Sequence, residues 1–234
     1  MIKLHQDGNT VVVAAATLAI GALLGAGIGY TAGNNKQEDS TNNNQSSQTV
    51  SATPTSDTAA ADTRVALNAA LREHVALAAT ALRDVFDSAP TADAAVAELD
   101  NNSLEVAGIV GSVYGADAEE QFLSLWRSHI GFFANYTTAA KTGDQAGMDQ
   151  ALEDLAGYGT DASAFFAAAN PNLPADAVMP LLIEHRNLVI DAVNAYGAED
   201  YALSFSKEAE AYDQMGDIAD AIAEAVVVQN PSNF

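Results

Sequence analysis

The chain has 234 residues, a formal net charge of −22 at pH 7 and no cysteine. The absence of thiols excludes disulfides, thiolate metal sites, cysteine nucleophiles and covalent c-type haem attachment. A chain this acidic repels the phosphates of nucleic acid, so no nucleic-acid partner is expected.

The N-terminal segment is expected to anchor the protein in a membrane. Residues 11–30 carry no charge, and as a helix they would cover about 30 Å, the thickness of the apolar core of a bilayer. Lys3 precedes this run and polar, acidic residues follow it, which places residues 1–10 in the cytoplasm. We predict a single-pass protein of the cell membrane, anchored by residues 11–33, with its C-terminal domain outside the cytoplasm. The alternative is a signal peptide that is cleaved, so that the protein is secreted.

Three glycines of this segment, Gly21, Gly25 and Gly29, recur at every fourth position. The repeated G-x-x-x-G spacing leaves one helix face without side chains, where a second helix can approach closely. It predicts a homodimer formed through the anchor. The alternative is that these glycines reflect only the general abundance of small residues in membrane helices.

Residues 34–62 are predicted to form a flexible low-complexity linker. They consist mainly of Asn, Gln, Ser, Thr, Asp and Ala, with almost no large apolar residue to bury. As a flexible coil this linker would hold the following domain about 30 Å from the membrane.

From residue 63 onward, apolar residues recur at three- and four-residue spacing, which indicates amphipathic helices. Proline and glycine punctuate them, at Pro90, Gly115, Gly143, the N-P-N-L-P turn at 170–174 and Gly197. The expected helices cover residues 63–87, 92–114, 117–142, 145–169, 175–196 and 199–228. The fold class is therefore all-α: an up-and-down bundle of about six helices with a four-helix core, in one domain over residues 63–234.

Two segments of this domain resemble each other. Residues 71–77 and 182–188 both read L-x-E-H-x-x-L, and a Gly-Ala-acid triplet follows in each half, at 115–117 and 197–199. The pattern indicates a duplicated helical hairpin, although so few matches also fit chance.

The predicted domain contains three histidines, His74, His129 and His185, each on the apolar stripe of a different helix. Three imidazoles that point into one bundle core can converge on a transition metal, because imidazole suits copper, zinc, iron and nickel. Such a site would need neutral imidazole, so its affinity is expected to fall below about pH 6.5. The alternative is a buried polar network with a purely structural role.

Four stretches carry a resemblance to a known family: LREHVALAATALRD, SVYGADAEEQFLSLWRSHIGFFANYTTAAKTGD, ANPNLPADAV and AYDQMGDIADAIAEAVVVQNPSNF. They resemble an uncharacterised family of exported bacterial helical proteins, sometimes labelled copper amine oxidase-like, over most of residues 64–234. The resemblance implies a histidine on four helices, matched here by His74, His129 and His185. In the fourth motif, A-Y-x-H-M, this chain has Gln214, a poor transition-metal ligand. Tyr136 and Gln214 are the further candidate ligands.

The residues favour a non-enzymatic protein. The N-Y-T at 135–137 matches only part of the amine oxidase motif, and no H-x-H pair exists. Three positions before the histidines stand Leu71, Trp126 and Leu182, not the glutamate of di-iron bundles. We predict an extracytoplasmic bundle that binds a transition metal such as copper through core histidines. The alternative is a structural or interaction protein of the cell envelope, without metal, whose acidic faces meet an envelope partner.

Overall fold

The computed structural model describes residues 58–234, and this part is entirely helical. Its helices are α1 (Ala59–Asp87), α2 (Ala92–Tyr114), α3 (Ala116–Thr142), α4 (Gln145–Ala169), α5 (Ala175–Gly197) and α6 (Tyr201–Gln229). The prediction of an all-α fold with six helices is confirmed. The predicted anchor, its glycine face and nearly all of the linker lie outside the described residues. None of the helices between residues 58 and 234 has the length and apolarity of a membrane span.

Capping side chains determine where several helices begin. The Thr58 hydroxyl accepts a hydrogen bond from the Ala61 amide, so α1 begins inside the segment predicted as linker. Asp144 accepts in the same way from the Gly147 amide at the start of α4. Ser88, with φ 53°, ends α1 in the left-handed region that commonly closes a helix.

The junction between α5 and α6 differs from the prediction. Gly197 was expected to separate the two helices, but it is the last residue of α5. The chain turns at Glu199, which has φ 61°, and Asp200 caps α6 by accepting from the Leu203 amide. Gly197 permits close packing instead, because a Cβ at this position would lie 3.1 Å from Cζ of Phe86. The nearby Phe86 ring thus explains why position 197 is a glycine, which the sequence pattern attributed to a turn.

Replacing Gly197 with alanine is expected to lower the free energy of unfolding by about 1–3 kcal/mol, because the new methyl group overpacks against Phe86. Gly108→Ala in α2 is the matched control, since a Cβ there meets nothing within 4 Å. The control should gain about 0.5–1 kcal/mol from helix propensity. Denaturant midpoints of the two variants should move in opposite directions. Equal shifts would contradict the packing role of Gly197.

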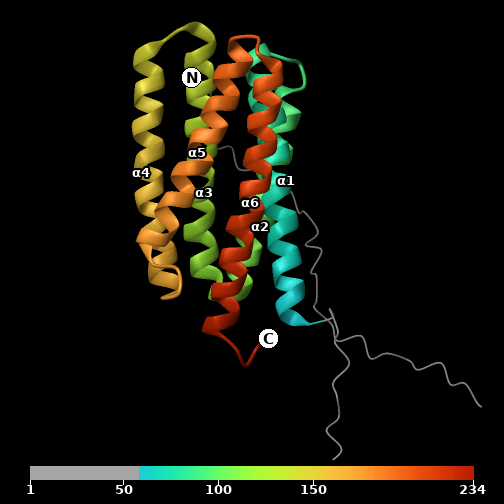
Figure 1. Ribbon diagram of the computed structural model, residues 1–234, viewed down its shortest axis with the longest axis vertical. Coiled ribbons are helices and arrows are strands. Elements are labelled where there is room, and N and C mark those ends of the chain that lie inside the picture. The colour runs from blue at the N-terminus through green and yellow to red at the C-terminus, as the bar shows by residue number, and fades with distance from the viewer. Residues whose placement is uncertain (1–57) are drawn as a thin grey trace, which may run out of the picture. The chain divides into compact units, whose positions relative to one another are not determined.

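The six helices lie side by side along the long axis of the bundle (Figure 1). Each helix packs against its neighbours in sequence, and α6 returns to pack against α1. In addition, α1, α3 and α5 contact one another. Because short loops make consecutive helices antiparallel, these three inner helices run in the same direction. Residues in the middle of α1, α3 and α5 are therefore brought to the same level.

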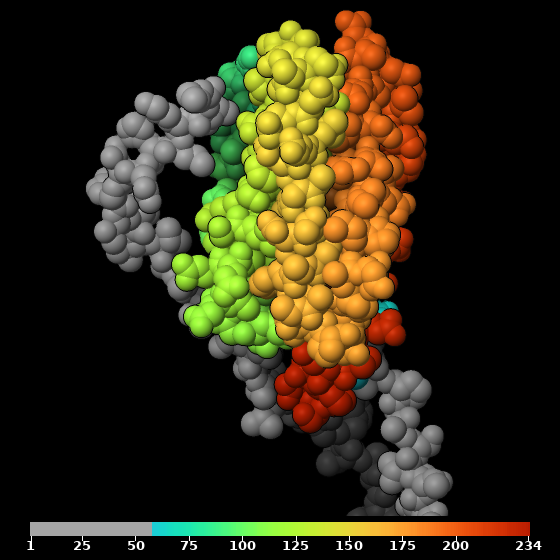
Figure 2. All heavy atoms as spheres, turned by 90° about the vertical axis from the view of Figure 1, so that its left-hand side faces the viewer, coloured from blue at the N-terminus to red at the C-terminus, as the bar shows by residue number. Residues whose placement is uncertain are grey.

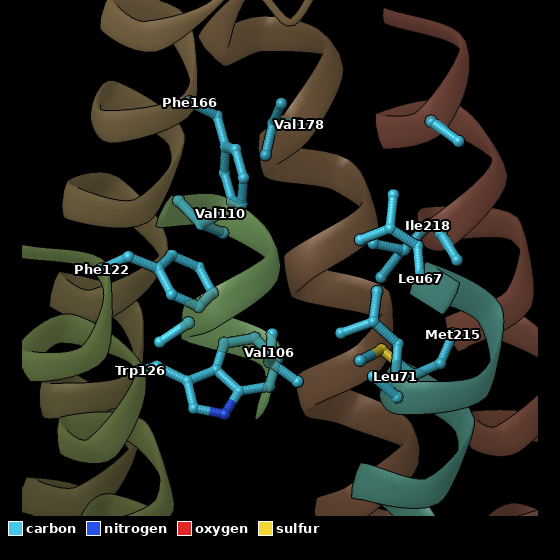
Figure 3. Packing of buried hydrophobic residues seen from close by; sticks show 14 of the residues in the cluster. Leu67, Leu71, Val106, Val110, Phe122, Trp126, Phe166, Val178, Met215 and Ile218 are labelled. Carbon is cyan, nitrogen blue, oxygen red and sulfur yellow. The ribbon is translucent and has the colours of Figure 1, made fainter. Parts of the chain in front are cut away.

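Two apolar clusters fill the bundle. The larger one gathers large side chains from all six helices, including Leu71, Val106, Phe122, Trp126 and Met215 (Figure 3). The smaller one lies further along α1, α3 and α5 and is built from Leu82, Phe133, Tyr136, Ala151, Leu155, Ile190 and Val193. The histidines occur at the boundary between the two clusters.

Candidate metal centre in the bundle core

The three domain histidines come together in the centre of the bundle. His74, His129 and His185 lie near the middle of α1, α3 and α5, with exposed fractions of only 2%, 3% and 9%. The rings of His74 and His129 have centroids 5.4 Å apart. All three side chains line one cavity of about 50 Å³, which exceeds the roughly 10–15 Å³ that a single water molecule requires.

Two aromatic side chains hold the imidazoles in place. The Trp126 ring centroid lies 4.7 Å from those of both His74 and His129. Tyr158 of α4 stacks on His129 from another side, with centroids 4.7 Å apart and an interplanar angle of 27°. Trp126 lies three positions before His129 in the sequence, whereas nothing in the sequence connected Tyr158 with the histidines. Its place on an apolar stripe of α4 was visible in the sequence, whereas its partner was not.

The hydrogen bonding of these histidines is incomplete. Within the described residues, Nδ1 of His74, His129 and His185 is buried and has no protein hydrogen-bond partner. A buried polar atom left in this state costs about 1–3 kcal/mol. A histidine kept for a structural role normally donates or accepts through its ring nitrogens. Three imidazoles around one cavity, each with one unpartnered nitrogen, are therefore suited to receive a ligand.

All three imidazoles are neutral at pH 7. Burial lowers the pKa of His74 to about 3, with a further contribution from nearby His185, and Asn102 offsets part of this shift. Burial lowers the pKa of His185 to about 4, again partly offset, here by Gln214. The pKa of His129 is held well below its usual value by burial and by the other two histidines, and contact with the Trp126 backbone offsets part of this shift. Neutral imidazole is the form that binds metals, so protons compete at lower pH than the sequence-based expectation of about 6.5.

The structure brings Gln214 to the histidines but not Tyr136. Gln214 of α6 donates from Nε2 to the Leu181 carbonyl oxygen at 2.9 Å, and its buried Oε1 has no partner among the described residues. Tyr136 packs in the smaller apolar cluster, and its hydroxyl donates to Asn194 Oδ1 at 2.9 Å. The Tyr136 hydroxyl is therefore bonded to Asn194 of α5 rather than directed to the histidines.

The sequence did not single out Asn102, a second polar neighbour of the site. This residue of α2 is buried and donates from Nδ2 to the Ala70 carbonyl oxygen at 3.0 Å and to Glu73 at 3.4 Å. Its Oδ1 has no partner among residues 58–234. Asn102 therefore joins α2 to α1 one turn before His74, and it links the exposed Glu73 side chain to the site.

The three imidazoles are donors that suit a transition metal, but their rings are not already arranged to bind one ion. Among residues 58–234, no three His, Asp or Glu side chains are positioned to hold one ion together. Binding by all three histidines therefore requires their rings to turn within the cavity. Comparison with known proteins finds no matching family model, no matching curated protein and no matching solved structure. The family resemblance carried by the sequence motifs stays a prediction.

Proposed function

We propose that this protein is a membrane-anchored, extracytoplasmic helical bundle that binds one transition-metal ion through His74, His129 and His185. The observation that carries the proposal is the shared cavity lined by three buried, neutral imidazoles, each with an unpartnered Nδ1. Among divalent first-row metals, imidazole sites bind copper most strongly. A bound ion would supply the missing partners of the ring nitrogens and would link α1, α3 and α5. Gln214, whose side chain is near enough to His185 to raise the pKa of that histidine, would assist.

A calorimetric titration with Cu²⁺ and Zn²⁺ at pH 7.5 tests this function on the full chain in detergent. The chain should carry His5→Ala, because His5 is the only histidine outside residues 58–234. One ion per chain is expected. Replacing His129 with phenylalanine preserves an aromatic ring against Tyr158 but removes a ligand. We expect it to weaken binding by more than the roughly 10–100-fold cost of losing an outer-shell partner.

Tyr136→Phe is the matched control for this titration. Its hydroxyl is bonded to Asn194, so its removal should cost about 1 kcal/mol of stability and leave metal affinity unchanged. Absence of saturable binding in the parent chain would overturn the proposal. Binding that persists in His129→Phe but disappears in Tyr136→Phe would also overturn it.

A second function, interaction with an envelope protein, is favoured by one surface feature. Tyr201, Phe205 and Tyr212 recur on α6 with exposed fractions of 50%, 56% and 40%. The guanidinium groups of Arg83 and Arg72 lie over the rings of Phe205 and Tyr212. Exposed aromatics with arginine are typical of protein-binding surfaces. A metal titration without binding would favour this function over the first.

A further inference from the structure

A second cavity lies beside the histidines, in the larger apolar cluster. Its volume is about 320 Å³, and large apolar side chains such as Leu67, Val110, Phe122, Trp126 and Ile218 line it (Figure 3). Protein interiors seldom contain voids much larger than a water molecule. An engineered apolar cavity of about 150 Å³ already binds benzene, and small-molecule pockets begin near 300 Å³. This cavity is therefore large enough for a ligand, and its apolar lining suits a ligand that is mostly hydrocarbon.

The cavity opens between α4 and α5, which lie side by side in yellow and orange on the face shown in Figure 2. Its exposed lining residues are Ala156 and Thr160 on α4 and Ile183 on α5. Gly159 contributes no side chain to this wall, and a Cβ there would meet only the Met179 sulfur, at an ordinary 3.4 Å. Small residues on α4 thus leave room for an entrance.

One cationic side chain lines this cavity. Arg186 of α5 is half-buried, and it donates from Nε and Nη2 to Asn187 Oδ1 at 3.2 and 2.9 Å. The other arginines of residues 58–234 each form an ion pair with an Asp or Glu of the same region. Arg186 forms none with a carboxylate of this region, although the chain is strongly acidic. A guanidinium without an anion beside an apolar cavity is a site for an anionic head group.

We propose that this cavity binds a free single-chain carboxylate, whose hydrocarbon chain fills the space between α4, α5 and the core and whose carboxylate pairs with Arg186. The volume excludes a two-chain lipid. The proposal goes beyond metal binding. His129 and His185 also line this cavity, but Arg186 and Gly159, on which the test rests, do not line the histidine cavity.

Trp126 makes the test direct. It is the only tryptophan of the chain and lines the cavity, so its fluorescence reports occupancy. Decanoate is titrated into the full chain at pH 7.5, below its micellar concentration, and a saturable change with a Kd on the order of 10–100 µM is expected. Arg186→Gln should weaken decanoate binding about tenfold or more, because a charge-assisted contact is lost. Decanol binding should change less than twofold.

Gly159→Phe is designed to plug the entrance and should abolish binding of both decanoate and decanol. Gly157→Phe is its matched control on the same helix, since Gly157 is exposed and a Cβ there meets nothing within 4 Å. The control should bind as the parent does. Circular dichroism and copper titration of Gly159→Phe show whether the bundle and the histidine site are intact, which separates failure here from failure of metal binding.

Three results would overturn the proposal. The first is the absence of a saturable response to decanoate. The second is equal binding by folded Gly159→Phe and by the parent. The third is binding of decyltrimethylammonium as tight as that of decanoate, which would deny Arg186 its role.

Discussion

Replacing the three core histidines with apolar residues of similar size is expected to stabilise the metal-free domain at neutral pH. The variant carries His74→Leu, His129→Phe and His185→Leu. Each orphaned Nδ1 costs about 1–3 kcal/mol, whereas an apolar swap of similar volume usually costs less than about 1.5 kcal/mol. A net gain of a few kcal/mol should raise the melting temperature by about 5–10 °C in a domain of this size.

Ser204→Ala is the control for this substitution. Ser204 is also buried, but its hydroxyl donates to the Ala192 carbonyl oxygen at 3.0 Å. Its removal should therefore destabilise the domain by about 1 kcal/mol. Stabilising substitutions commonly cost function where they remove a site that is itself destabilising, so this gain should come with loss of metal binding. If the triple variant instead loses more than about 1 kcal/mol, the histidines are structural and the metal site loses its main support.

Acid is expected to destabilise the metal-free domain steeply. The folded-state pKa values of His74 and His185 are about 3 and 4, and that of His129 is also lowered, against about 6.5 when unfolded. Below pH 6.5 the unfolded chain therefore binds more protons than the folded one, and the stability of the domain decreases as the pH is lowered. Each histidine contributes about 1.4 kcal/mol per pH unit, so three contribute about 4 kcal/mol per unit. Above pH 6.5 they contribute no pH dependence.

Denaturant unfolding at pH 7.5, 6.5, 5.5 and 4.5 measures this effect. Since domains are stable by about 5–15 kcal/mol, much of the folded state should be lost between pH 5 and 4. Protonation of surface carboxylates reduces the charge repulsion in a chain with a net charge of −22, and this effect stabilises the folded state as the pH is lowered. The triple variant separates the two effects, because it should lack the histidine slope. An identical pH profile in parent and variant would contradict the pKa assignments.

The helices could be predicted from the sequence because their signals are local. Pro90, Gly115 and Gly143 end or separate helices within one or two residues of the expected places. Gly197 misled the prediction, since its lack of a side chain serves a contact with Phe86, which is remote in sequence. The start of α1 was placed too late, because Thr58 caps it from within a polar segment.

The site could be predicted only in part. The apolar spacing placed each histidine on an inward face, but it cannot say which helices meet, and the contacts among α1, α3 and α5 decide this. For the same reason the stacking of Tyr158 on His129 and the pairing of Tyr136 with Asn194 were not predicted. Such partners depend on distances between helices, which periodicity along one helix does not encode.

Electron paramagnetic resonance of the copper-loaded full chain tests the central claim most directly. With His5→Ala in place, the Cu²⁺ signal should show coupling to imidazole nitrogens, and His74→Leu, His129→Phe and His185→Leu should each reduce that coupling. Tyr136→Phe should leave the spectrum unchanged. A spectrum without imidazole coupling, or one that none of the three histidine substitutions alters, would contradict a metal centre in the bundle core.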